Sequence, residues 1–391
     1  MVVIKAVSAK SILDSRKEKT ILVSIKTNVG SFSASAPNGK SRGKYEAKPY
    51  KNSLEKDIET LKKFTGYFSE DEIEKFEDLR RVEDIVHMHI GANTLFALES
   101  AVLKALAKEQ KKEIWQLINS KISASTGKFP RLVGNCIGGG MHSGSEAKKK
   151  PDFQEFLLIP KTKTVKEAYD LSRNIKKSLE IPLKKKDEGF TGKKNDEDAW
   201  QTSLNEKEVL EILKNAGVDL GIDVAASTFH KRKKYLYHNP PLTRDSEEQA
   251  MYISNLIKNF SLFYIEDPFF EEDFSGFSNL LKKHPSSLIV GDDLTVTSEK
   301  RFRKAIEEKS INAIIVKPNQ NGSLLEVRDI CETARKHNIK IVFSHRSGET
   351  MESILADLAF GFQADFFKCG ITGKERESKI KRLIEIERKL R

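Results

Sequence analysis

Apolar and polar positions alternate along the first part of the chain. The runs VVIKAVSA, TILVSIKT and SFSASA mix the two kinds of residue, and Asn28 and Gly30 lie between the second run and the third. Alternation with a period of two predicts strands, so a small antiparallel sheet is expected within residues 1 to 50. Between residues 54 and 117 the apolar spacing becomes helical, most clearly at Leu95, Leu98 and Val102. These patterns predict an N-terminal α+β domain.

A different pattern follows, in which short apolar strands alternate with amphipathic helices. From Val218 onward the predicted strands are VDLGIDVA, LFYIEDP, SLIVGDDL, INAIIVKP, IKIVFSH and ADFFKCG, and SEKRFRKAIEEK and SLLEVRDICETARKH are helices between the later ones. Repeated strand and helix units predict a parallel sheet, and this many units predict a closed β/α (TIM-like) barrel. Gly127 and Pro130 interrupt the pattern between the two parts. We therefore expect domains at 1–128 and 129–391.

Charged residues stand at the carboxyl ends of the predicted barrel strands. In chain order they are Asp223, Glu266, Asp292, Lys317, His345 with Arg346 and Ser347, and Lys368. One charged residue at a strand end usually marks only the return of the chain to water. Six strands in succession are harder to explain in that way, and in such barrels the active site lies at these ends. The strand ends therefore predict a functional site.

The order of the charges indicates a type of chemistry. Asp223, Glu266 and Asp292 would repel one another unless a cation neutralised them, and an all-oxygen set suits Mg²⁺. The following strands supply cations. A partly desolvated lysine among other cations has a lowered pKa and can act as a base, and a guanidinium suits a phosphate. The pattern predicts a site for an anionic substrate that loses a proton.

Composition narrows the class of protein. Charged residues make up 32% of the chain, no apolar run could span a bilayer, and the N-terminus lacks the continuous apolar centre of a signal peptide. Three cysteines without CxxC spacing indicate free thiols in a reducing compartment, with neither zinc nor disulfides. We expect a cytoplasmic protein with no membrane partner.

The net charge of +11 raises the question of nucleic-acid binding. Lysines such as Lys108, Lys111 and Lys282 are spread over most predicted helices and form no stripe interleaved with aromatic residues. A solvated basic surface is therefore the favoured interpretation, and nucleic acid is not a favoured partner. Such a surface could still gather an anionic substrate.

Several segments resemble those of enolases, nearly from end to end. They are ILDSR at 12–16, GAN at 91–93, Gly139-Gly140 before His142, QEF at 154–156, DEG at 187–189, IDVAAS at 222–227, IEDPF at 265–269, GDDLTVT at 291–297 and SHRSGET at 344–350. The last three are long and specific. The resemblance implies an enolase-superfamily barrel with an N-terminal capping domain. It also implies a homodimeric phosphopyruvate hydratase, a lyase of glycolysis and gluconeogenesis that reversibly dehydrates 2-phosphoglycerate to phosphoenolpyruvate with two Mg²⁺ ions per site.

The resemblance also implies a role for each matching residue. Lys317 would take the C2 proton, as the base of such sites does, and Glu188, aided by Glu155, would help hydroxide leave from C3. The implied ligands of the first Mg²⁺ are Asp223, Glu266 and Asp292, and Ser41 in the loop PNGKSRG would meet the second. The implied substrate contacts are Arg346 and Ser347 for the phosphate, with His142, His345 and Lys368.

Some positions depart from the family's pattern and leave alternatives open. Gly138 stands where an Asn is usual, Lys40 and Arg42 add cations to the loop, and Pro318 follows the proposed base. One alternative is a superfamily member that acts on a different hydroxy-acid, which the segment SHRSGET argues against. The other is a protein with an enolase body that binds RNA or a protein, and this role could coexist with catalysis.

Overall fold

The computed structural model describes residues 1–390 except 41–42, 69–71, 123–126 and 144–148. Its N-terminal part contains a four-stranded antiparallel sheet in the order β3-β2-β1-β4. The strands are β1 (Val2–Leu13), β2 (Lys19–Thr27), β3 (Gly30–Ser35) and β4 (Glu72–Ile73). The three strands predicted from alternation are confirmed. β4 has only two residues, too few to give a periodic signal.

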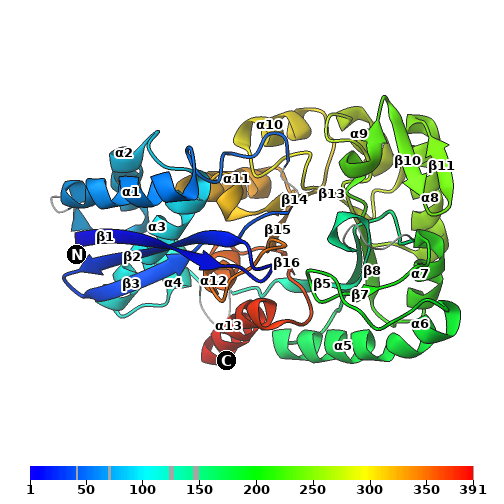
Figure 1. Ribbon diagram of the computed structural model, residues 1–391, viewed down its shortest axis with the longest axis horizontal. Coiled ribbons are helices and arrows are strands. Elements are labelled where there is room, and N and C mark those ends of the chain that lie inside the picture. Colours follow the sequence, from blue (N-terminus) through cyan, green and yellow to red (C-terminus); the bar gives the residue numbers. More distant parts are fainter. Residues whose placement is uncertain (41–42, 69–71, 123–126, 144–148, 391) are drawn as a thin grey trace.

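Helices cover one face of this sheet (Figure 1). They are α1 (Leu54–Phe64), α2 (Leu79–Val86), α3 (Ala92–Gln110) and α4 (Ile114–Ile118), with the 3-10 turns η1 (Thr65–Phe68) and η2 (Phe76–Asp78). α3 is buried on more than its predicted face, because Phe96, Ala101 and Leu103 are also buried. It packs against β2 and β3 and also contacts the barrel segment η5 (Pro318–Gln320). α3 is therefore a central helix between the sheet and the barrel.

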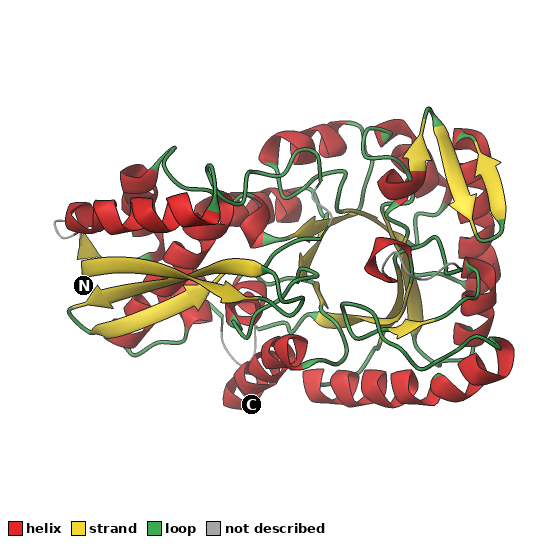
Figure 2. Ribbon diagram, viewed as in Figure 1, coloured by secondary structure: helices red, strands yellow, loops and turns green. Residues whose placement is uncertain are grey.

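The rest of the chain forms a closed barrel (Figure 2). Its strands are β5 (Arg131–Gly138), β6 (Glu155–Ile159), β8 (Asp219–Asp223), β12 (Tyr264–Glu266), β13 (Leu288–Gly291), β14 (Ala313–Val316), β15 (Lys340–Ser344) and β16 (Phe366–Lys368). Pairing of β16 with β5 closes the ring, and β7 (Trp200–Gln201) pairs with β5 outside it. The six predicted strands and the barrel are confirmed. Apolar side chains such as Val290, Ile315 and Val342 form its inner core.

One strand contradicts the expectation of an all-parallel sheet. β6 pairs antiparallel with both β5 and β8. A parallel crossover needs a long connection, usually a helix, and the described part of the β5–β6 connection contains only the 3-10 turn η3 (Gly140–Ser143). The chain therefore returns directly, and the first residue of β6, Glu155, lies at the end of the barrel where the other strands finish.

Helices surround the barrel. They are α5 (Val165–Ser178), α6 (Glu180–Lys186), α7 (Glu206–Leu213), α8 (Ser246–Phe260), α9 (Phe274–Lys283), α10 (Glu299–Glu307), α11 (Leu324–Lys336), α12 (Ile354–Gly361) and α13 (Lys374–Leu390). α10 and α11 confirm the two helices predicted between the later strands. After the 3-10 turn η4 (Ala226–Phe229), a small antiparallel sheet of β9 (His230–Lys231), β10 (Lys234–His238) and β11 (Pro241–Arg244) lies at the end of the molecule away from the N-terminal part (Figure 1).

The N-terminal part contacts the barrel next to the barrel mouth, which we define as the end where most strands finish. Asn319 Nδ2 donates to Asn93 Oδ1 at 2.8 Å, and Asn38 forms a backbone bridge with Gly348. Among the described residues, no helix combines the length and apolar character that crossing a membrane requires.

Candidate active site

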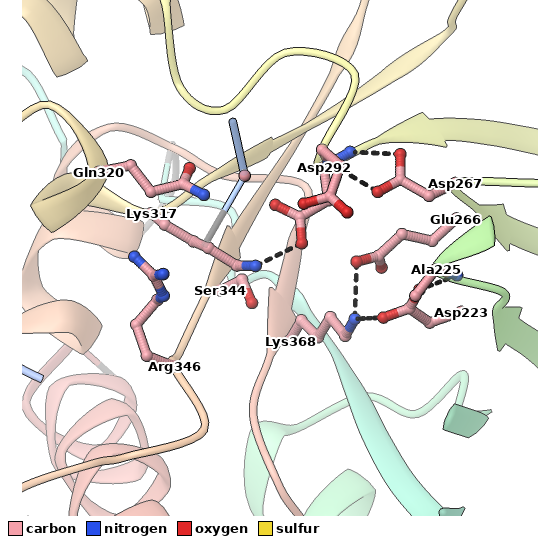
Figure 3. Close-up of polar contacts among 12 residues, drawn as sticks. Asp223, Ala225, Glu266, Asp267, Asp292, Lys317, Gln320, Ser344, Arg346 and Lys368 are labelled. Atoms are coloured by element: carbon pink, nitrogen blue, oxygen red, sulfur yellow. Dashed lines mark hydrogen bonds and ion pairs between the residues drawn. The ribbon is translucent and has the colours of Figure 1, made fainter. Parts of the chain in front are cut away.

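Three carboxylates from neighbouring strands meet at the barrel mouth. β8 ends at Asp223 and β12 ends at Glu266, and strand pairing places these two residues side by side. Asp292 follows Gly291, the last residue of β13. All three side chains are buried, and Figure 3 shows them gathered on one side of the mouth. Strand register thus brings the predicted acidic group together.

Lys368, the last residue of β16, neutralises part of this negative charge. Its Nζ lies 3.0 Å from Asp223 Oδ2, 2.8 Å from Glu266 Oε1 and 3.3 Å from Glu155 Oε2. Burial alone lowers the pKa of Lys368, but these carboxylates outweigh burial and raise the pKa well above its ordinary value. Burial and repulsion from Asp223 raise the pKa of Glu266 to about 8. Lys368 is therefore a fixed positive charge inside the mouth.

Lys317 follows β14 and faces the acidic group (Figure 3). Its Nζ donates a hydrogen bond to Asp292 Oδ2. Burial lowers the pKa of Lys317, yet attraction to Asp292 outweighs burial, and the pKa is raised. The expectation of a lowered lysine pKa is wrong for this arrangement. That expectation was based on the neighbouring cations alone and left out the ion pair between Lys317 and Asp292.

Asp267 is a site residue that the sequence analysis missed. Its backbone lies in the left-handed region, with a φ of 41°. Its carboxylate accepts the backbone N–H groups of Asp292 at 3.0 Å and Asp293 at 2.6 Å. Asp267 thereby fixes the turn that carries Asp292 to the mouth. The adjacent acids Glu266 and Asp267 were visible in the sequence, but adjacency does not say what each carboxylate binds.

The acidic group has the properties of a site for a hard divalent cation. Its donors are carboxylate oxygens, which Mg²⁺ prefers. Asp292 Oδ1 is buried and has no hydrogen-bond partner in the described part of the chain, so its lone pairs are free for a ligand. Asp267, Asp292 and Asp293 also offer oxygens within 4.8 Å of one another. The residues present therefore fit a divalent metal ion. Asp292 belongs both to the set with Asp223 and Glu266 and to the set with Asp267 and Asp293.

Two carboxyl groups and two imidazoles form a second cluster at the mouth. His142 Nδ1 lies 3.6 Å from an oxygen of Glu155 and 3.6 Å from an oxygen of Glu197, and His345 Nε2 lies 3.6 Å from Glu197. Burial and repulsion from Glu197 raise the pKa of Glu155 well above its ordinary value. Burial acts on Glu197 too, but His142, His345 and Arg376 outweigh it and lower the pKa of Glu197. The two carboxyl groups therefore differ in their affinity for a proton.

Glu188, predicted as the catalytic acid, does not lie at the mouth. It is exposed in the turn after α6. The preceding Asp187 is buried instead, where it accepts hydrogen bonds from Thr202 Oγ1 at 2.6 Å and from the backbone N–H of Ser203 at 2.7 Å. Glu197, in the second acidic segment DED at 196–198, is the residue that the structure brings to the mouth. The placement of Glu188 is corrected accordingly.

Buried contacts hold the segment that carries Glu197. Asn195 Oδ1 accepts the backbone N–H groups of Glu197 at 3.0 Å and Ala199 at 2.9 Å. The side chain of Asn195 lies over Gly138, since a Cβ atom on Gly138 would come within 2.1 Å of Asn195 Nδ2. Glycine at 138, which departs from the family's Asn, is thus the residue that leaves space for Asn195.

The predicted phosphate contacts lie where the mouth meets the N-terminal part. Glu46 accepts hydrogen bonds from Arg346 Nη2 at 3.0 and 3.1 Å. Ser347 Oγ accepts hydrogen bonds from the backbone N–H of Lys40 at 2.8 Å and from Arg16 Nη1 at 3.0 Å. Arg16 supplies a cationic side chain at this hydroxyl and Lys40 a backbone donor, and such donors suit an anionic group. Neither Arg16 nor Glu46 was predicted from the sequence as a site residue.

A single pocket unites most of the predicted site. The predicted residues that line it are His142, Glu155, Asp223, Asp292, Lys317, His345, Arg346, Ser347 and Lys368. Glu266 is fully buried beside it, Glu188 is not part of its lining, and Ser41 lies outside the described residues.

Comparison with known proteins gives a consistent result for the whole chain. The family described as "Enolase, C-terminal TIM barrel domain" matches residues 128–391, and "Enolase, N-terminal domain" matches residues 4–118. The enolase of Methanosphaera stadtmanae is 35% identical, with 99% of this chain and 97% of that protein covered. The enolase of Pyrobaculum aerophilum is 34% identical over 94% of this chain and 91% of that protein. The enolase of Natronomonas pharaonis is 33% identical over 99% of both.

Proposed function

The chain belongs to the enolase family, and on that premise we propose which residues perform the reaction. The protein is a lyase that dehydrates 2-phosphoglycerate to phosphoenolpyruvate in glycolysis, and it uses a divalent metal ion. The observation that carries the residue assignments is the meeting of three carboxylates with Lys317, Arg346 and Lys368 in one barrel mouth.

Asp223, Glu266 and Asp292 are the proposed ligands of the first Mg²⁺. When bound, the ion supplies positive charge to the substrate carboxylate as the C2 proton leaves. Lys368 adds a second fixed charge next to Asp223 and Glu266, at 3.0 and 2.8 Å. We also propose a second Mg²⁺ with Ser41 as a ligand, which rests on family resemblance.

Lys317 is the proposed base that removes the C2 proton. A hydrogen next to a carboxylate is a weak acid, so the base needs a position fixed against the substrate. The Lys317 amine is held at Asp292, on the cationic side of the mouth. A base must be neutral before it accepts a proton, and loss of the ion pair with Asp292 favours the neutral amine. A metal ion held by Asp292 would supply this effect, because its positive charge would compete with Lys317 for the carboxylate.

Glu155 and Glu197 are the proposed pair that assists the departure of hydroxide from C3. The role that the sequence analysis gave to Glu188 passes to Glu197, because Glu197 lies in the pocket with Glu155 and His142. The pKa of Glu155 is raised and that of Glu197 is lowered, and two carboxyl groups whose pKa values are shifted apart are typical of a pair that transfers a proton. His142 and His345 then orient the pair and line the substrate.

Arg346 and Ser347 are the proposed phosphate contacts. Glu46 fixes the orientation of Arg346, and the backbone N–H of Lys40 and the side chain of Arg16 surround the Ser347 hydroxyl. The phosphate group would therefore meet several donors at once. Closure of the loop that contains Lys40 would exclude water from the mouth.

We further propose a homodimer in the cytoplasm. The dimer rests on family resemblance, and the compartment is supported by three buried, free cysteines. Light scattering at micromolar concentration tests the dimer. A monomer mass would contradict it.

A metal titration tests the assignment of the site. We expect dehydration of 2-phosphoglycerate to stop after chelation and to return with Mg²⁺. Asp292→Asn should weaken Mg²⁺ binding measured by calorimetry, because it removes the negative charge of a proposed ligand. Asp329→Asn, a change at an exposed carboxylate of α11, is the matched control and should leave binding unchanged. Equal Mg²⁺ affinity in both variants would contradict the ligand assignment.

A further inference from the structure

The proposed phosphate contacts lie on a segment that has left the barrel sheet. β15 ends at Ser344, and residues 345–350 form no helix or strand apart from the single bridge between Gly348 and Asn38. We call residues 345–350 the phosphate loop. All six are buried, and buried backbone outside regular structure needs hydrogen-bond partners from elsewhere in the chain. The positions of Arg346 and Ser347 therefore depend on the groups that surround the loop.

The last helix, α13, supplies two buried cations to the phosphate loop. Arg376 and Lys379 are three residues apart, so they lie on the same face of α13, and they are only 2% and 1% exposed. Arg376 Nη2 donates a hydrogen bond to the carbonyl oxygen of Ser347 at 2.7 Å. Lys379 Nζ donates one to the carbonyl oxygen of Thr350 at 2.9 Å. The helix, which lies beside the junction of the two parts of the molecule (Figure 1), thus holds the loop at two points.

Lys379 is also connected to Arg346 through a buried carboxylate. Lys379 Nζ lies 2.8 Å from Glu349 Oε2, and both side chains are buried. Glu349 Oε1 accepts the backbone N–H of Arg346 at 3.0 Å, and its Oε2 accepts that of Thr350 at 3.2 Å. The ion pair therefore fixes the carboxylate that in turn fixes the backbone of Arg346.

The stability of the fold does not by itself account for these cations. A buried ion pair contributes little to stability, because the loss of hydration offsets the attraction, and apolar residues of similar volume often serve as well. Arg376 carries a further cost, since its Nε is buried without a hydrogen-bond partner in the part of the chain that the structure describes. What the two cations supply is direction, because each holds a particular oxygen of the phosphate loop.

Arg376 reaches the loop through a space left by a glycine. A Cβ atom on Gly370 would come within 2.6 Å of Arg376 Cδ and within 3.1 Å of the carbonyl oxygen of Glu197. Glycine at 370 therefore allows the arginine side chain and the segment that carries Glu197 to lie close together. The path of Arg376 from α13 to Ser347 thus depends on the absence of a side chain at this position.

We propose that Arg376 and Lys379 are positioning residues for the dehydration, which hold the phosphate loop so that Arg346 and Ser347 meet the substrate phosphate together. This inference rests on the proposed assignment of Arg346 and Ser347 as phosphate contacts. The N-terminal part holds the same loop from another side, through the bridge at Gly348. α13 supplies the contacts from the barrel side.

Replacement of each cation by methionine tests the proposal, because methionine is long, flexible and uncharged. Arg376→Met and Lys379→Met should each raise the KM for 2-phosphoglycerate roughly tenfold while kcat changes by less than about threefold, since the phosphate is bound in both the ground state and the transition state. Mg²⁺ affinity measured by calorimetry should stay unchanged. Lys379→Met leaves Glu349 as an unpaired buried charge, whereas Arg376 donates to a carbonyl oxygen. Arg376→Met therefore decides the question if Lys379→Met does not fold.

Arg382→Met is the matched control on the same helix. Arg382 lies three residues after Lys379 and pairs with the buried Asp357 at 2.7 Å, outside the phosphate loop. This variant should lower the unfolding temperature and leave KM unchanged. An equal rise of KM in Arg382→Met would show a general structural effect and overturn the proposal.

Arg346→Ala separates this proposal from the assignment on which it rests. It should raise KM at least as much as the methionine variants do. An unchanged KM in Arg346→Ala would contradict the phosphate assignment itself. A raised KM in Arg346→Ala, together with an unchanged KM in folded Arg376→Met and Lys379→Met, would leave that assignment standing and overturn the role of α13.

Discussion

Two regions of the barrel mouth hold their charges by different means. The strand ends carry Asp223, Glu266 and Lys368. Pairing between the strands fixes which residue lies beside each of them. The long connection between β6 and β8 carries Glu197, which is held by side-chain contacts of Asn195. A strand-end residue cannot move without breaking the sheet. A loop residue depends on a few hydrogen bonds, and its position is therefore more easily disturbed.

The largest effect is expected at a strand end. Lys317→Ala should lower kcat by at least roughly 10² to 10⁴, because the proposed base is lost. Folding and substrate binding should persist. The matched control is Lys340→Ala at the start of the neighbouring strand, where Lys340 pairs with Asp365 at 3.1 Å far from the pocket. Steady-state kinetics of both variants measures the difference, and a similar kcat for the two would remove Lys317 from the reaction.

A smaller loss of kcat is expected when the segment that carries Glu197 is held less firmly. Asn195→Ala removes both hydrogen bonds that hold the backbone around Glu197, so kcat should fall by about tenfold while KM changes little. Asn205→Ala is the matched control, since Asn205 Oδ1 also accepts a backbone N–H group, that of Glu208 at 3.0 Å, at the start of α7. The control should lose about 1 kcal/mol of stability and keep its kcat. If both variants keep full activity, loop rigidity does not matter for catalysis.

The same contrast explains what the sequence could predict. The apolar strands identified the barrel, and the charged residues at the carboxyl ends of the strands identified Asp223, Glu266, Asp292, Lys317 and Lys368. These residues follow from the topology, because the ends of neighbouring strands meet. β6 was missed because an antiparallel return has no helical crossover, and only the family resemblance identified Glu155.

The β6–β8 connection could not be interpreted in this way. It contains two similar acidic segments, around Glu188 and around Glu197, and its composition is that of a charged loop. The choice between them depends on Asp187, which turns toward Thr202 and Ser203, and on the space above Gly138. These contacts join residues that periodicity does not relate. Resemblance alone therefore selected Glu188.

An effect on stability and not on activity concerns a buried acid outside the mouth. Burial raises the pKa of Glu206 to about 7, and its Oε1 accepts the backbone N–H of Asp152 at 2.5 Å. Because the folded-state pKa is raised, this group stabilises the fold fully below about pH 4.5 and loses that contribution as pH rises toward 7. The unfolding free energy should fall less between pH 4.5 and pH 7 in Glu206→Gln than in the unmodified protein. The difference should be at most about 3 kcal/mol. Denaturation at pH 5 and pH 8 measures it, and an unchanged pH dependence would contradict the raised pKa.

The most direct test compares the two acidic segments of the β6–β8 connection by isotope exchange. Glu197→Gln should lower dehydration by roughly 10² to 10⁴ while exchange of the C2 hydrogen with solvent continues, because Lys317 still removes the proton. Glu188→Gln, an exposed change in the same connection, should leave both rates within about twofold of the unmodified enzyme. The opposite result, full dehydration in Glu197→Gln and loss in Glu188→Gln, would contradict the assignment of hydroxide departure to the pair of Glu155 and Glu197 inside the barrel mouth.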